Sequence, residues 1–320
     1  MAGRDLTMEP GQPVLIEKAA RFDFRSGINQ RSYSISVGLP LVPFPQAGCP
    51  VLYVLDGDLY FASAVEAVRV YAPEVAVVGV GYPRHEAYIK GVLERHGHIP
   101  AYISDQPASR TIAYLERLYD LTLPASDEVL ASDFDKTIRV RASEVGGLDA
   151  FLKVLEMEIK PRIAGLAPID SSSQAIFGHS AGGLAVLHAL FVAPGTFRSF
   201  IAASPAIWWS MKAVLAGEAQ FSNAVRAGTA TPRILITMGS EEETPDPKYA
   251  ARFGLDFAEE AARLHKHRMV ENARDLTARL RALRGSGAFE VEEYAVFPKQ
   301  RHNIAAWPAL GRAVAFAFPR

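Results

Sequence analysis

The sequence lacks features that would point to several classes of protein. It has a single cysteine, Cys49, in 320 residues, which excludes an internal disulfide and a cysteine-based zinc site. No apolar run approaches the roughly 20 residues needed to span a bilayer. Residues 1–13 have neither the basic nor the apolar region of a signal peptide. We therefore expect a cytoplasmic protein with no membrane partner.

An excess of charge of one sign is also missing. The chain has 34 Lys and Arg against 35 Asp and Glu, so no overall field would attract nucleic acid. Hydrophobic residues make up 49% of the chain, which is enough to bury a large core. Because no repeat, low-complexity tract or long linker divides the chain, we expect one domain over residues 1–320. The sequence leaves open whether that domain is a monomer or a homodimer.

Short apolar runs alternate with longer segments of helical period. This alternation is typical of α/β proteins with a mostly parallel central sheet flanked by helices. Residues 33–39 alternate like an early strand, while continuous runs at 51–55 and 75–80 predict buried central strands. Further strands are predicted at 174–177, 199–203, 234–238 and 289–296, and helices at 148–163, 183–191 and 304–318.

Two segments interrupt the alternation, and we expect both to shape a substrate site. Residues 84–146 are polar and carry scattered Pro and Gly, which predicts a loop-rich, cap-like insertion over the sheet. Residues 241–287 contain a long stretch in which charges surround apolar positions at helical spacing, so we expect a helical insertion there.

The chemistry centres on a G-x-S-x-G string, Gly178 to Gly182, between a predicted strand and a predicted helix. Such a strand-to-helix turn is typical of a nucleophile elbow, whose strained serine requires small residues two positions before and after it. Ser180 is the predicted nucleophile. The amide of Ala181, at the helix N-terminus, can donate to an oxyanion. The alternative interpretation is an ordinary glycine-rich turn.

A serine hydroxyl needs a histidine base, and the histidine needs an acid that orients it. In the α/β-hydrolase order of Ser, acid and His, the histidine follows the last strand, which selects His302. His265 and His267 lie on a charged helix and are expected to face solvent. His188 lies inside the apolar helix after the elbow and is expected to pack there.

The acid is expected in the loop after strand 234–238, where four carboxylates compete. We choose Glu242, three residues after the glycine that ends the strand, and leave Glu241, Glu243 and Asp246 as alternatives. A solvated surface position is the competing interpretation for each of them.

A second oxyanion donor is expected in the loop after strand 51–55. We assign it to the amide of Asp58, which follows the flexible Gly57. The alternative is a plain strand-to-helix turn capped by Asp56. Tyr60, in the same loop, is an expected substrate contact.

Five motifs together carry a family resemblance over nearly the whole chain. They are PVLYVLDG (50–57), VGVGYP (78–83), RLYDLT (117–122), GHSAGG (178–183) and SPAIWW (204–209). The chain resembles the putative esterase (esterase D-like) family of α/β-hydrolases, and within it the branch of siderophore esterases. The resemblance implies a triad of Ser180, Glu242 and His302, oxyanion amides at Asp58 and Ala181, and no metal or cofactor.

The resemblance also implies a substrate pocket. Trp208 and Trp209 are expected near the acyl or leaving-group pocket, and Arg117 near the mouth of the site. Arg301 stands where the family usually has glycine, so it either favours an acidic substrate or points to solvent. The connection over residues 84–117 is longer than the family's, which leaves the cap particular to this chain.

These observations predict a serine carboxylic-ester hydrolase that forms an acyl-enzyme and acts on a small-molecule ester of aromatic or siderophore type. An acyltransferase with the same triad and a catalytically inactive binding protein are the alternatives. The D-x-D-x-T string at 133–137 resembles that of haloacid-dehalogenase-type phosphatases, but no apolar strand precedes its first aspartate. We therefore reject a phosphatase.

Overall fold

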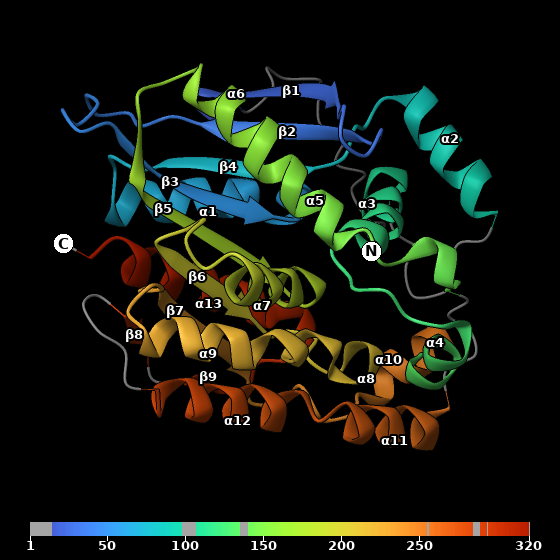
Figure 1. The fold of residues 1–320 in the computed structure, drawn as a ribbon. Coiled ribbons are helices and arrows are strands. Elements are labelled where there is room, and N and C mark those ends of the chain that lie inside the picture. The colour runs from blue at the N-terminus through green and yellow to red at the C-terminus, as the bar shows by residue number, and fades with distance from the viewer. Residues whose placement is uncertain are drawn as a thin grey trace, which may run out of the picture.

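The protein is built around one β-sheet, seen in a computed structural model that describes residues 15–97, 107–134, 140–254, 256–283, 289–292 and 294–319. The strands of these residues are β1 (Ala19–Arg25), β2 (Ser32–Gly38), β3 (Cys49–Leu55), β4 (Ala76–Gly81), β5 (Ile169–His179), β6 (Ser199–Ala203), β7 (Arg233–Gly239), β8 (Glu290–Val291) and β9 (Ala295–Phe297). Their order is β1-β2-β4-β3-β5-β6-β7-β8, and β9 also pairs with β7. The β1–β2 and β2–β4 pairs are antiparallel and the others parallel, which confirms the predicted mostly parallel sheet (Figure 1).

Helices cover both faces of the sheet, so its central strands are buried on two sides. Every residue of β4 and of β6 is buried, which is why their sequences read as continuous apolar runs. One face packs against α1 (Gly57–Tyr71) and α13 (His302–Ala317), and the other against α5 (Leu148–Val154), α6 (Lys160–Ala164), α7 (Ala181–Val192), α9 (Glu218–Arg226) and α12 (Met269–Arg281) (Figure 1). Residues 155–159 are π-helical, so the predicted helix at 148–163 is helical throughout.

The two edges of the sheet differ from the sequence prediction. Strand β1 was not predicted, because none of its residues is buried and its sequence has no apolar run. The single strand predicted at 289–296 is wrong, since β8 and β9 are separate. Val291 pairs with Ile234 and Ala295 with Thr237, so the chain carries one extra residue between those pairs and cannot continue as one regular strand.

The insertion at 84–146 is mostly helical in its described part, which corrects the expectation of a loop-rich cap. It contains α2 (Glu86–His96), α3 (Ala108–Asp120), α4 (Asp127–Asp133) and the 3-10 turn η2 (Ala142–Glu144). Residues 98–106 and 135–139 lie outside the described residues. Asp133 ends a helix and not a strand, which agrees with the rejection of a phosphatase; residues 135–137 of that string are among those outside.

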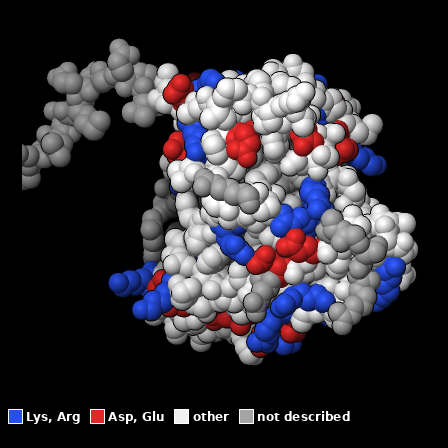
Figure 2. Space-filling model, turned by 90° about the vertical axis from the view of Figure 1, so that its left-hand side faces the viewer, with Lys and Arg blue, Asp and Glu red and all other residues white. Residues whose placement is uncertain are grey.

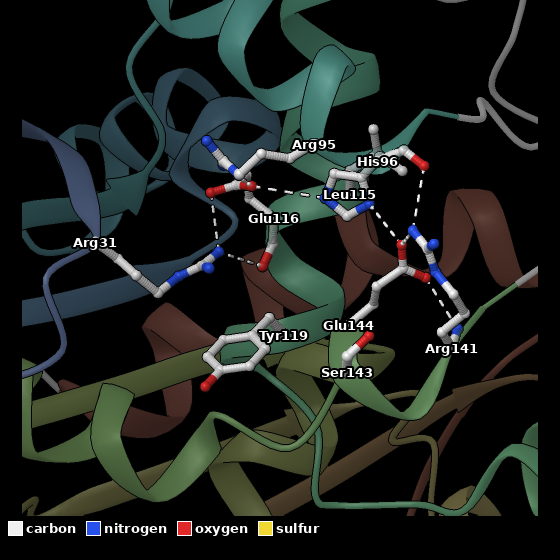
Figure 3. Close-up of a pocket in the computed structure, with 9 residues that line it drawn as sticks. All are labelled: Arg31, Arg95, His96, Leu115, Glu116, Tyr119, Arg141, Ser143 and Glu144. Atoms are coloured by element: carbon white, nitrogen blue, oxygen red, sulfur yellow. Dashed lines mark hydrogen bonds and ion pairs between the residues drawn. The ribbon is translucent and has the colours of Figure 1, made fainter.

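A cluster of ion pairs surrounds a cavity of about 350 Å³ between α2, α3 and η2 (Figure 3). Glu116 accepts from Arg31 and Arg95, both at 2.9 Å, and Arg141 lies 2.6 Å from Glu144. Burial opposes the ionisation of Glu116, but its hydrogen bond with His96 and the charge of Arg31 outweigh burial and lower its pKa to about 2. The cluster therefore ties the cap to the loop that precedes β2.

The described residues of the segment 241–287 are mostly helical. The segment contains α10 (Pro247–Phe253), α11 (Phe257–His267) and α12. Figure 1 shows α11 beside α4, and Lys266 Nζ donates to the backbone oxygen of Ser132 at 2.7 Å and contacts Asp133 Oδ1 at 3.1 Å. The two insertions therefore contact each other.

The surface shows no region of one charge sign on the side drawn in Figure 2. Lys and Arg side chains lie next to Asp and Glu side chains in this view. The described residues contain ion pairs such as Arg233–Glu290 and Arg312–Glu292. Across the described ranges, no helix has both the length and the apolar character that crossing a membrane requires.

Candidate active site

Ser180 lies in the turn between β5 and α7, at the carboxyl end of a central strand. Its backbone has φ 60° and ψ −117°, a strained conformation for a residue with a side chain. The structure therefore has the strand-turn-helix geometry of a nucleophile elbow.

The glycines around Ser180 are required by close backbone contacts. A Cβ atom on Gly178 would lie 2.2 Å from the carbonyl oxygen of Gly182, and one on Gly183 would lie 2.8 Å from the carbonyl oxygen of Ala203. Both distances are shorter than any tolerable contact with backbone. These contacts explain why the turn carries glycine at those positions.

The structure brings Ser180, His302 and Glu242 together. His302 Nε2 lies 2.9 Å from Ser180 Oγ, and His302 Nδ1 lies 2.7 Å from Glu242 Oε2. His302 is the first residue of α13, and Glu242 follows β7, so both side chains come from the same sheet edge as the elbow. Since a carboxylate accepts hydrogen bonds, Nδ1 carries the ring proton and Nε2 is free to accept from the serine hydroxyl.

Glu242 is fixed by two further donors. Its Oε1 accepts from the Gly239 amide at 2.6 Å and from the Ser204 hydroxyl at 2.5 Å. The residue is only 3% exposed, so its charge acts on His302 with little screening by water. The acid is thereby held in one orientation toward the imidazole.

The three alternative acids have other partners. Glu243 accepts from the Val270 amide at 2.7 Å, and Asp246 caps α10 by accepting from the Lys248 amide at 2.9 Å. Glu241 lies 3.6 Å from Arg301, which also donates to the backbone oxygen of Thr244 at 2.9 Å. Arg301 therefore contacts the loop that carries Glu242. Neither of the two expectations for Arg301, an acidic substrate or solvent, had included this contact.

Both amides expected to bind an oxyanion lie in the first turn of a helix. Ala181 is the first residue of α7, and Asp58 is the second residue of α1. Backbone N–H groups in a first turn have no partner within their own helix, so they can donate to an anion. The Asp58 side chain is used elsewhere: it accepts from the Tyr82 amide at 2.8 Å and pairs with Arg84.

Arg117 lies behind the site, and its guanidinium is occupied by protein groups. It donates to both carboxylate oxygens of Asp56, at 2.7 and 2.8 Å, and to the backbone oxygen of His179 at 3.2 Å. Arg117 is 9% exposed and Asp56 is 6% exposed. Asp56 makes no side-chain cap of α1, because its carboxylate is used in this ion pair.

The aromatic residues expected around the substrate differ in exposure. Trp209 is 2% exposed and its Nε1 donates to the backbone oxygen of Leu123 at 2.7 Å, so the structure places it in the core. Trp208 is partly exposed. Tyr60 is 6% exposed, and its hydroxyl lies 3.2 Å from His179 Nδ1. Of the four expected substrate contacts, Trp208 is therefore the one that is not buried.

Sequence reasoning missed several residues that the structure brings to this site. Ser204 binds Glu242, Asp56 binds Arg117, and the His179 ring lies 4.7 Å from the His302 ring. Each stands at or just after the carboxyl end of a parallel strand, a position that could have identified it. His267 was expected to face solvent and is 2% exposed, because it packs against Trp208 at 3.8 Å between ring centroids. Nothing in its helical sequence signals that contact.

Two buried imidazoles make stability depend on pH. Burial, and then the charge of Arg263, lower the pKa of His267 to about 3, while burial and the charges of His302 and Arg117 lower that of His179 well below 6.5. An unfolded chain binds these protons near pH 6.5, so stability is complete above that pH and falls as the pH drops toward 3.

We therefore expect a His267→Phe variant to be less sensitive to acid. Between pH 7 and 4.5, the wild type should lose about 2–3 kcal/mol more of its free energy of unfolding than the variant does, since phenylalanine does not titrate. Urea unfolding of both proteins at the two pH values measures this difference. Equal losses would contradict a neutral, buried His267.

Comparisons with known proteins identify the family of this chain. The family model described as putative esterase matches residues 26–276. The chain is 30% identical to a ferri-bacillibactin esterase of Bacillus subtilis over 296 residues, 90% of this chain and 85% of the relative. It is 31% identical to a siderophore triacetylfusarinine C esterase of Aspergillus fumigatus over 240 residues, 72% and 69% of the two chains.

A solved structure also matches the fold. The BES protein from Bacillus cereus superimposes with a TM-score of 0.70 at 25% identity, over 97% of this chain and 98% of that one. The α/β-hydrolase fold and the resemblance to esterases of the siderophore branch are thereby confirmed. The chain belongs to the putative esterase family and is an ester hydrolase.

Proposed function

We propose that the protein hydrolyses carboxylic esters through an acyl-enzyme formed on Ser180, with His302 as the base and Glu242 as the orienting acid. The observation that carries this proposal is the continuous chain of hydrogen bonds from Ser180 Oγ through both ring nitrogens of His302 to Glu242. It begins at a strained elbow, which exposes the serine at the end of the sheet.

In the first half of the reaction, His302 Nε2 accepts the proton of Ser180 Oγ while Oγ attacks the carbonyl carbon of the ester. The charge that develops on the carbonyl oxygen is stabilised by the amides of Ala181 and Asp58. The protonated His302 then gives its proton to the leaving alcohol, and the acyl group remains on Ser180.

In the second half, water takes the place of the alcohol. His302 removes a proton from water, the hydroxide attacks the acyl carbon, and the returning proton restores the serine. Throughout, Glu242 stabilises the positive imidazolium and holds the ring in the required tautomer. Because Ser204 and the Gly239 amide already bind Glu242, its orientation does not depend on substrate.

Arg117 and Tyr60 contact residues that lie next to the proposed catalytic groups. Arg117 joins α3 of the cap to Asp56, two residues before the Asp58 amide, and to the backbone of His179, next to the nucleophile. Tyr60 packs against His179, whose ring lies beside that of His302. We therefore propose that both residues fix the position of the loop that carries the Asp58 amide relative to the turn that carries Ser180.

The proposed substrate is a small ester of the siderophore or aromatic type. Two relatives at 30% and 31% identity are named as esterases of ferri-bacillibactin and of triacetylfusarinine C. The partly exposed Trp208, between the two insertions, is the proposed contact for a flat substrate group. The one-domain organisation and the cytoplasmic location remain predictions from the sequence.

Hydrolysis of p-nitrophenyl butyrate by the wild type and by His302→Ala tests the function. We expect the variant to lose at least about 10³-fold in kcat, because the substitution removes the ring nitrogen that lies 2.9 Å from Ser180 Oγ and accepts its proton. His265→Ala is the matched control, since His265 is exposed and lies outside the site. A His302→Ala rate equal to that of the wild type would contradict the proposal.

The same assay with added alcohol distinguishes hydrolysis from acyl transfer. A hydrolase releases mainly butyric acid when ethanol is present, whereas an acyltransferase forms mainly the ethyl ester. Siderophore and aromatic esters then define the substrate. Absence of any hydrolysis across that panel would favour a catalytically inactive binding protein.

A further inference from the structure

Trp208 lies flat against an imidazole from the second insertion. Its ring and that of His267 are stacked, with centroids 3.8 Å apart and planes only 3° from parallel. Phe134, which follows α4 in the cap, meets the indole edge-on at 5.9 Å and 76°. The two insertions thus contribute one aromatic neighbour each to the same tryptophan.

The stack is what sets the orientation of Trp208. The neighbouring Trp209 is anchored by the hydrogen bond from its Nε1 to Leu123. The Nε1 of Trp208 is buried and has no hydrogen-bond partner among the residues that the structure describes. With no polar anchor of that kind, the indole plane is fixed by its ring contacts, and the parallel contact with His267 is the tightest of them.

Both ring nitrogens of His267 make hydrogen bonds. A guanidinium can only donate, so Arg263 donates to Nδ1 at 3.4 Å. Nε2 must then carry the proton, and it donates to the backbone oxygen of Asp133 at 2.9 Å. Glu260 pairs with Arg263 at 2.6 Å and keeps that guanidinium in place. The ring is therefore neutral, in one tautomer and in one plane.

The chain segment that leads to Trp208 is hydrogen-bonded to the catalytic centre. The segment that follows β6 is bonded to it at two points: Ser204 binds Glu242, and the Ala206 amide donates to the backbone oxygen of Ser180 at 3.1 Å. Trp208 comes two residues later.

We propose that His267 is a positioning residue that holds Trp208 as a flat wall of the substrate pocket, against which an aromatic ring of the ester packs. This inference rests on the proposed function and adds a residue that sets its selectivity. Aromatic rings gain most when they meet in an offset-stacked or edge-to-face arrangement, so a loosely held indole would discriminate poorly between aromatic and aliphatic esters.

The test compares kcat/KM for three esters in a pH-stat, with the intact protein and its variants. Ethyl butyrate has no ring, phenyl butyrate has the ring in the leaving group, and ethyl benzoate has it in the acyl group. His267→Gln keeps a donor for Asp133 but removes the stacking ring. His267→Phe keeps the ring, and His265→Gln is the control on the exposed side of the same helix.

In His267→Gln, we expect the ratio of kcat/KM for at least one aromatic ester to that for ethyl butyrate to fall about tenfold, mainly through KM. His267→Phe should retain the ratio within about threefold, and His265→Gln should match the wild type. Trp208→Leu removes the other ring of the stack and should lower the same ratio of kcat/KM. Near-UV circular dichroism of His267→Gln should also lose tryptophan signal, because the indole is no longer held.

Two results would overturn the inference, and they are distinguishable. If hydrolysis depends on Ser180 but both aromatic ratios stay unchanged in His267→Gln, the positioning role fails while the proposed function stands, whatever the result for Trp208→Leu. If the wild type shows no hydrolysis that Ser180→Ala abolishes, the proposed function fails, and the positioning role fails with it.

Discussion

Replacing Ser180 with alanine should lower kcat for ester hydrolysis by about 10⁵-fold or more, without unfolding the protein. The reaction requires an oxygen that can attack the carbonyl carbon, and the substitution removes it while leaving His302 and Glu242 in place. Steady-state kinetics with p-nitrophenyl butyrate measure the loss. A rate within tenfold of the wild type would contradict a covalent role for Ser180.

Ser180→Gly provides the matched control for stability. The backbone at Ser180, with φ 60° and ψ −117°, costs a residue with a side chain about 1–3 kcal/mol, and glycine adopts it without that cost. Glycine also gains roughly 0.5–1 kcal/mol of chain entropy on unfolding. We therefore expect Ser180→Gly to be as inactive as Ser180→Ala and more stable than it by about 0.5–2 kcal/mol in urea unfolding.

Replacing Arg117 with methionine should destabilise the protein by about 3–5 kcal/mol. The substitution leaves the Asp56 carboxylate buried without its bidentate partner, and it frees the backbone oxygen of His179. Since Asp56 stands two residues before the Asp58 amide, kcat should also fall, by up to about 100-fold. Urea unfolding and steady-state kinetics measure the two effects.

A control and a double substitution separate the ion pair from other effects of Arg117→Met. Arg95→Met, in the same cap, removes a guanidinium that is 56% exposed and should cost no more than about 1 kcal/mol. Adding Asp56→Asn to Arg117→Met removes the orphaned charge and should recover part of the lost stability. If Arg117→Met unfolds at the urea concentration of the wild type, the buried ion pair does not stabilise the fold.

The catalytic residues could be predicted because they follow one another along the chain in the order Ser, acid and His, each after a strand of the sheet. In a parallel sheet the carboxyl ends of strands share one edge, so the loops after β5 and β7 and the start of α13 had to meet there. This geometry brought Ser180 and His302 together. It narrowed the acid to four carboxylates, and Glu242 was chosen among them by its spacing from the glycine that ends β7. The structure places Glu242 on His302.

The surroundings of the site could not be predicted in the same way. Trp208 and Trp209 are adjacent and chemically identical, yet one is anchored in the core while the other is partly exposed. His265 and His267 share a charged helix, and only the second meets a tryptophan from a distant segment. Such differences depend on which side of an element its neighbours cover, and in the insertions those neighbours come from non-adjacent parts of the chain.

The edges of the sheet show the same limit. Strand β1 has one neighbouring strand and no buried residue, so its sequence lacks the apolar run that identified β3 and β4. The extra residue between β8 and β9 shifts the pairing with β7 without leaving a distinctive residue type behind. A strand that is buried on both faces has a continuous apolar sequence, and that sequence is what allows the strand to be predicted.

The central claim, a covalent acyl-enzyme on Ser180, is tested most directly by mass spectrometry of the intact protein. Wild-type protein is mixed with p-nitrophenyl butyrate, quenched in acid within milliseconds to seconds, and digested to locate the label. We predict one butyryl group per chain, on the peptide that contains Ser180, and none in Ser180→Ala. A label on another residue, or hydrolysis at the wild-type rate with no label at any time, would contradict the mechanism.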